Sequence, residues 1–87
     1  MKRRIFKYSF YHFRETVIEI PKDAEILSIQ NQSGVVTMWV LVDIDAVKIE
    51  RKFDLFTTGS DVPSSSIFRG TVQLNQGSFV VHVFEII

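Results

Sequence analysis

The chain has 87 residues, with ten basic and ten acidic side chains and no cysteine. A chain of this length forms one domain, here residues 1–87, and so small a domain keeps much of its apolar surface in contact with water. The absence of cysteine excludes disulfides and thiolate metal sites, and two histidines are too few for a histidine-based metal site without carboxylate help. The balanced charge gives no overall field that attracts nucleic acid or an anionic membrane, so we expect no cofactor, metal, membrane or nucleic-acid partner.

The N-terminal segment alternates apolar and polar residues, which predicts a β-strand at residues 3–10. Four of the ten positive charges lie in the first seven residues. They suit either a phosphate contact or a charged edge strand that resists aggregation, and we favour the edge strand. These charges belong to Lys2, Arg3, Arg4 and Lys7.

Six further strands are predicted in chain order. They cover residues 16–20, 25–30, 35–44, 47–58, 68–74 and 78–87. The alternation places Leu27 with Ile29 on one face of its strand, and Phe68 with Gly70 on one face of another. Residues 22–27 are the one segment that could form a helical turn, because no stretch keeps a 3.6-residue period.

About seven strands with turn signals every 8–12 residues are typical of a small all-β domain. We expect an antiparallel β-sandwich or barrel with at most one helical turn. The turn sequences NQSG and NQG place Gly34 and Gly77 where a positive φ is needed.

The segments 35–44 and 78–87 are apolar on both faces. A strand of this type is either central in a sandwich or covered by a second subunit, so we expect a homo-oligomer. Trp39 could stack on a nucleobase, but its own strand carries no flanking cation, and we favour the core or a subunit interface. The interface candidates are Trp39, Phe79, Val81, His82 and Phe84.

No catalytic set of residues stands out, and we expect that the protein is not an enzyme. The motif Gly-x-Ser-x-Gly is absent, and His82 shares the strand phase of Val80 and Phe84. A histidine so placed is usually hydrogen-bonded to a neighbour in the core or at an interface. Asp43 and Asp45 could hold a hard cation, but at the end of a strand we favour an Asx turn.

Arg51 shares the phase of the apolar residues Ile49, Phe53 and Leu55, so its guanidinium needs an anion. That anion is either a protein carboxylate, near Glu50 or on another subunit, or a ligand.

The segment 57–70 is the longest stretch without a strand-like apolar pattern. Its hydroxyls and the backbone N–H groups around Gly59 are of the kind that form an anion-binding nest. The side chain of Arg69 could reach the same anion. The same composition is typical of a solvated loop, so the segment could also be a connection between two strands with no role in binding. The ligand-binding candidates are Arg51, Thr57, Thr58, Gly59, Ser60 and Arg69.

Seven stretches of the chain, in this order, carry a resemblance to a known protein family. They are residues 4–8, 26–30, 39–43, 53, 58–59, 70–74 and 80–85. Together they resemble a family of small bacteriophage and prophage proteins, a domain of unknown function, which implies the cytoplasm of an infected bacterium as the place of action. The residues that match its pattern are Asp43, Asp45, Thr58, Gly59, Gly70, Thr71 and His82. The chain departs from it near Ile44 and Val47, where prolines are expected, and at 60–66, so no role is carried over to that loop tip.

Two hypotheses of function follow. The first is a phage-encoded, non-enzymatic binding protein in the host bacterial cytoplasm, a counter-defence factor that sequesters a nucleotide-like signal or a host protein. The alternative is a small virion, assembly or accessory protein that acts only through protein–protein contacts. Both hypotheses are consistent with a chain that has more apolar side chains than a domain of this size can bury.

Overall fold

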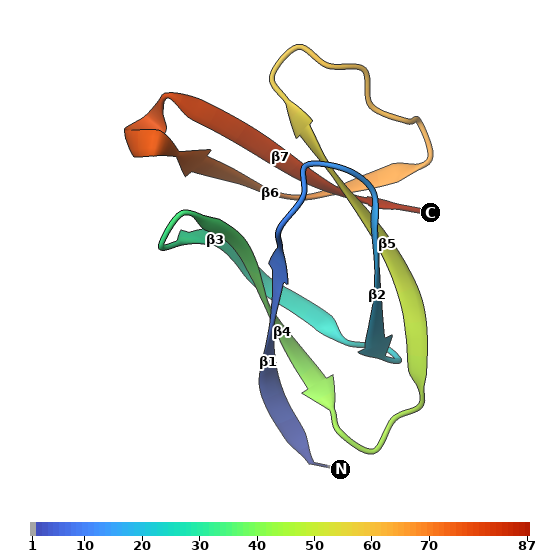
Figure 1. Ribbon diagram of the computed structural model, residues 1–87. Coiled ribbons are helices and arrows are strands. Elements are labelled where there is room, and N and C mark those ends of the chain that lie inside the picture. The colour runs from blue at the N-terminus through green and yellow to red at the C-terminus, as the bar shows by residue number, and fades with distance from the viewer. Residues whose placement is uncertain (1) are drawn as a thin grey trace.

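The computed structural model describes residues 2–87, and they form an antiparallel β-sandwich of seven strands (Figure 1). The elements are β1 (Arg3–Phe10), β2 (Thr16–Pro21), β3 (Glu25–Gln32), β4 (Val35–Asp43), β5 (Lys48–Thr57), β6 (Ser66–Leu74), a 3-10 turn η1 (Asn75–Gly77) and β7 (Phe79–Ile86). One sheet has the order β1-β4-β3 and the other β2-β5-β7-β6. The predicted all-β class is confirmed, and the two sheets do not close into a barrel. No helix in this part of the chain is long and apolar enough to span a membrane.

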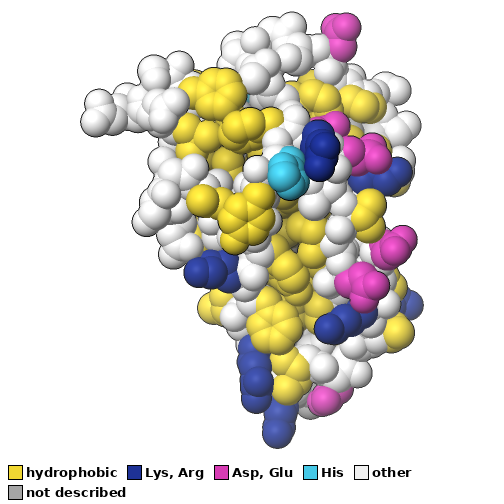
Figure 2. Space-filling view, viewed as in Figure 1, with side chains coloured by type: hydrophobic (Ala, Val, Ile, Leu, Met, Phe, Trp, Pro, Cys, Tyr) yellow, Lys and Arg dark blue, Asp and Glu magenta, His cyan; other side chains and the backbone are white. Residues whose placement is uncertain are grey.

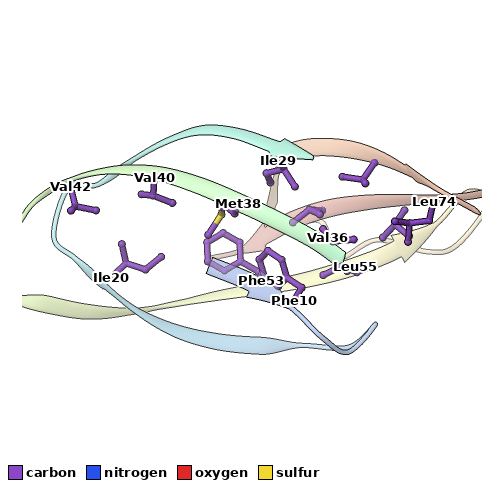
Figure 3. Packing of buried hydrophobic residues seen from close by; sticks show 13 residues of the cluster. Phe10, Ile20, Ile29, Val36, Met38, Val40, Val42, Phe53, Leu55 and Leu74 are labelled. Atoms are coloured by element: carbon purple, nitrogen blue, oxygen red, sulfur yellow. The ribbon is translucent and has the colours of Figure 1, made fainter. Parts of the chain in front are cut away.

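The core lies between the two sheets and consists of the inward-facing residues of every strand (Figure 3). In β4 these are Val36, Met38, Val40 and Val42, all at most 1 % exposed. The ring of Phe10 meets that of Phe53 edge to face, with centroids 5.8 Å apart. Burying each such side chain contributes about 1.5–3 kcal/mol, so the alternation read from the sequence is what holds the sheets together.

Two tight turns take the positive φ that the sequence predicts. At the β3–β4 hairpin, Ser33 and Gly34 have φ of 51° and 88°, the pattern of a type I′ turn. The side chain of Asn31 supports it, because its Oδ1 accepts a hydrogen bond from Gly34 N over 2.7 Å. Gly77, with φ of 89°, ends η1 at the β6–β7 connection. The helical turn is therefore at 75–77 and not at 22–27, where a turn leads directly into β3.

Two β-bulges change the faces that simple alternation predicts. The β3–β4 register shifts between Ile26 and Ser28, which leaves Leu27 exposed instead of beside Ile29 in the core. The β6–β7 register shifts between Phe68 and Gly70. Phe68 and Gly70 therefore face opposite sides of the sheet, because one extra residue reverses the alternation.

The two lateral sides of the sandwich differ. On one side β3 lies against β6, where Asn31 Nδ2 donates to the carbonyl oxygen of Gln73 over 3.2 Å. On the other side lie β1 and β2, the edge strands of different sheets, which are joined by the loop at residues 11–15 (Figure 1). The prediction that residues 3–10 form an edge strand is confirmed.

Candidate functional site

Glu85 of β7 holds the guanidinium groups of two arginines from the neighbouring strands. Arg51 of β5 donates from Nε to Glu85 Oε2 over 2.6 Å and from Nη2 to Oε1 over 2.7 Å. Arg69 of β6 donates from Nε and Nη2 to the same Oε1, over 3.0 and 2.8 Å. Arg51 Nη1 also donates to the carbonyl oxygen of Ala24 over 2.9 Å. This Arg–Glu–Arg cluster therefore links three strands of one sheet to the segment that enters the other.

The electrostatics of the cluster favour the charged forms. The Glu85 side chain is 7 % exposed, against 14 % for Arg51 and 29 % for Arg69. Burial raises the pKa of Glu85, but hydrogen bonds from both guanidinium groups and their positive charges outweigh it, so this pKa lies below the ordinary value. The pKa of Arg51 is raised mainly by its hydrogen bond to Glu85.

Arg51 thus finds its anion within the chain, on a residue that the sequence reasoning did not single out. The sequence nevertheless contains a pattern that could identify Glu85 as the partner of Arg51. Glu85 shares the strand phase of Val81 and Val83, as Arg51 shares that of Phe53 and Leu55. Opposite charges in the apolar phases of two strands indicate a pair, because neither can be buried alone.

The six candidates for ligand binding are not brought to one place. Thr57 to Ser60 form a turn in which Ser60 N donates to Thr57 O over 3.1 Å and Gly59 has a φ of 92°. Thr57 pairs with Val81, whereas Glu85, which holds both arginines, lies four residues further along β7, about 13 Å away. Arg51 and Arg69 therefore face the interior at Glu85 and do not join the turn.

His82 is held between two threonines on the outer face of the four-stranded sheet. Its Nε2 lies 2.9 Å from Thr58 Oγ1 and its Nδ1 lies 2.9 Å from Thr71 Oγ1. A hydroxyl can donate or accept, so either tautomer of the ring satisfies both bonds. The ring is fixed in orientation, which suits a contact surface.

Three phenylalanines surround this histidine on the same outer face. Phe56 pairs with His82 across β5 and β7, and Phe68 pairs with Phe84 across β6 and β7. The ring of Phe84 meets those of Phe56 and Phe68 edge to face, with centroids 5.8 and 5.5 Å apart. We call Phe56, Phe68, Phe84 and His82 with its two threonines the aromatic surface. The bulge at Arg69 creates it, because without the bulge Phe68 would face inward.

The five interface candidates fall in different places. His82 and Phe84 belong to the aromatic surface, and Trp39 is half-buried on the outer face of the other sheet, not in the core. Val81 is 1 % exposed, so it is a core residue and cannot contribute to an interface. Phe79 packs against the core and meets Phe13 edge to face at 5.4 Å.

The Asx turn predicted for Asp43 and Asp45 is confirmed. Asp45 N donates to Asp43 Oδ1 over 3.0 Å, and Ala46 N donates to Asp43 O over 3.1 Å. The Asp43 carboxylate is thereby occupied in ending β4.

Comparison with known proteins complements this geometry. No curated protein and no solved structure matches the chain. One family model matches residues 1–87, the whole length. The chain therefore belongs to the family described as Domain of unknown function (DUF7352).

Proposed function

We propose that the protein is a non-enzymatic binding protein whose aromatic surface contacts a partner protein. The sequence resemblance to small phage proteins supports the finer form of this proposal. In that form a phage encodes the protein, and it neutralises a host defence protein in the bacterial cytoplasm.

The observation that carries the proposal is the placement of three phenylalanine rings on an outer sheet face. The core already contains thirteen buried apolar residues, so these rings are not needed to fill it. Phe68 is 54 % exposed although it could have been buried by regular alternation. Clusters of exposed apolar side chains mark interaction sites, and rigid aromatic rings are favoured as binding anchors.

The polar groups beside the rings support a protein partner over a phosphate-bearing ligand. The two arginines that would balance a phosphate are both bonded to Glu85. Beside the rings, Thr58, Thr71 and His82 supply hydrogen-bonding groups, and the acidic Asp54 is opposite Phe84 in the β5–β7 register. A carboxylate beside the rings disfavours a phosphate, and polar groups around an aromatic centre are the usual composition of a protein–protein contact.

The test compares two neighbouring residues on opposite faces of β6. Phe68 and Ile67 are 54 % and 43 % exposed, but only Phe68 belongs to the aromatic surface. Tagged parent, Phe68→Ser and Ile67→Ser proteins are incubated with bacterial extract, and the retained proteins are quantified by mass spectrometry. We expect a protein retained by the parent and by Ile67→Ser but reduced about ten-fold or more by Phe68→Ser, as for an anchor residue.

Two results would contradict the proposal. One is a set of retained proteins that does not differ between Phe68→Ser and Ile67→Ser. The other is calorimetric binding of a mononucleotide or cyclic nucleotide by the parent that Phe68→Ser leaves unchanged, since this would favour a ligand site elsewhere. Thermal melting of both variants checks folding, and each should lose less than about 1 kcal/mol.

A further inference from the structure

The outer edge of β1 differs from the other three sheet edges within residues 2–87. Edge strands β3 and β6 contain bulges, and β2 has six residues and ends at Pro21. Bulges, short length and proline prevent any chain from pairing with an edge, whereas the positive side chains of β1 deter only a strand that brings no compensating negative charge. β1 has eight residues and pairs with β4 in an uninterrupted register from Arg3 to Phe10. It is therefore the edge best suited to accept an added strand.

The register fixes which backbone groups of β1 are free. Ile44 N donates to Lys2 O over 3.1 Å, so Lys2 belongs to a hydrogen-bonded pair with β4. In an antiparallel ladder such pairs alternate, so even-numbered residues of β1 bond to β4 and odd-numbered ones point away. The N–H and C=O groups of Arg3, Ile5, Lys7 and Ser9 therefore face the open edge.

Apolar side chains border this edge. Phe6 and Tyr8 of β1 and Ile18 of β2 are half-buried against the margin of the core. Figure 2 shows hydrophobic side chains in a column down the middle of this view, over β1 and between β1 and β2. A strand added to β1 would cover part of this column with every second side chain.

The edge is strongly positive. Lys2, Arg3, Arg4 and Lys7 lie in the first seven residues, which contain no acidic residue. None of the four takes part in an ion pair with another described residue, and Lys7 Nζ donates to the neutral Gln32 Oε1 over 3.1 Å. The rest of the chain has six basic and ten acidic residues, a formal charge of −4. Figure 2 shows basic side chains at the lower end of the hydrophobic column, where β1 begins.

We propose that β1 binds an extended, acidic segment of a partner protein, which adds as a fourth strand to the three-stranded sheet. Its backbone bonds to the odd-numbered residues of β1, and its carboxylates lie beside Arg3 and Lys7 on the outer face. Its intervening apolar side chains cover Phe6 and Tyr8. This mode of strand addition takes affinity from backbone bonds and specificity from alternate side chains.

The charge argues against two other occupants. A second copy paired along this edge through its own β1 would bring two sets of the same four positive charges together, and like charges on adjacent strands are destabilising. A nucleic acid would satisfy the charge but not the row of free backbone donors and acceptors or the hydrophobic column.

The experiment uses fluorescence anisotropy with labelled heptapeptides that alternate glutamate and valine, or lysine and valine. We expect the glutamate peptide to bind the parent at least about ten-fold more tightly than the lysine peptide at low salt, and to weaken as salt rises toward about 0.5 M. The double variant Arg3→Glu/Lys7→Glu should weaken binding about ten-fold or more. The matched control Lys48→Glu/Lys52→Glu, with the same change in net charge on the other sheet, should bind almost as the parent does.

A backbone variant distinguishes strand addition from general charge attraction. Ile5→Pro removes an N–H that faces the open edge and leaves the β4 ladder intact, so it should reduce binding several-fold without a change of charge. Equal binding by Ile5→Pro, equal binding by the control double variant and Arg3→Glu/Lys7→Glu, or equally tight binding of a single-stranded oligonucleotide would each overturn the proposal. Circular dichroism of each variant confirms that the sandwich is retained.

Discussion

At the scale of single residues, the most informative side chain is Glu85. Its carboxylate accepts hydrogen bonds from Arg51 and Arg69, and it is the one acidic side chain that lies almost fully buried in the described chain. Removing one member of a buried ion pair costs more than replacing the whole pair, because the remaining charge is left without a partner. Glu85 is therefore the residue at which one atom change should alter stability most.

We predict that Glu85→Gln destabilises the fold by about 3 kcal/mol, the cost of leaving the Arg51 charge uncompensated in a poorly hydrated place. The measurement is urea unfolding at neutral pH. The triple variant Arg51→Met/Arg69→Met/Glu85→Leu is the control, because it removes all three charges of the cluster and apolar side chains of similar volume should recover most of the loss. Equal losses in the single and the triple variant would show that side-chain volume, and not charge, matters here.

The lowered pKa of Glu85 predicts how stability depends on pH. Because this carboxyl has a lower pKa in the folded state than its ordinary value of 4.5, its contribution is complete above that value. The contribution is lost as the pH falls through the lower, folded-state pKa, where protonation breaks the pair. The parent should therefore lose stability relative to Glu85→Gln as the pH falls from neutral to well below 4.5. A stability difference that stays constant over this range would contradict the prediction.

At the scale of elements, the two bulges decide what the outer faces display. The bulge in β6 turns Phe68 outward and lets Arg69 reach Glu85, while Gly70 returns to the inner face. A Cβ at Gly70 would lie 3.2 Å from Ile29 Cβ, where β6 packs against β3. The glycine thus permits β6 to pack closely against β3.

We predict that Gly70→Ala destabilises the protein by about 1–3 kcal/mol, the usual cost of overpacking. Its φ is not positive, so the effect comes from space and not from backbone strain. Thr71→Ala, one residue away on the exposed face, should stay within about 0.5 kcal/mol of the parent. Chemical unfolding of both variants gives the comparison, and a Gly70→Ala protein as stable as the parent would mean that β3 can move away.

The same elements show where sequence reasoning succeeds and where it fails. Periodicity located all seven strands, because burial on one face forces a two-residue repeat. It misassigned Leu27 and Phe68, because a bulge inserts one residue and leaves no mark in an alternation pattern. The sequence did not identify Glu85 as the partner of Arg51. The order of strands within a sheet, which brings β7 beside β5, cannot be derived from local sequence patterns.

At the scale of the whole molecule, apolar side chains lie on both outer faces of the sandwich. The aromatic surface lies on the four-stranded sheet. On the three-stranded sheet Trp39 lies at the centre of β4, and Ile5 and Leu41 are opposite each other in the β1–β4 register. Ile5 is 61 % exposed. A domain of this size cannot cover both faces by itself, and a second copy is the simplest cover for the face around Trp39.

We predict that the protein forms a homodimer through the outer face of β3 and β4 around Trp39 and Leu41, packed so that the positive edge of β1 stays outside the contact. Light scattering at about 50 µM should give twice the chain mass of 10.1 kDa, since weak dimers form at micromolar concentrations. Trp39 is the one tryptophan of the chain, so its fluorescence reports on this face directly. Dilution should shift its emission to longer wavelength as the dimer separates and water reaches the indole.

Trp39→Ser should be monomeric and folded, whereas Val47→Ser, which removes an exposed apolar side chain from the β4–β5 loop, should remain dimeric. A parent mass of one chain at this concentration, or a Trp39→Ser protein that is still dimeric, would show that this face is not where copies of the chain meet.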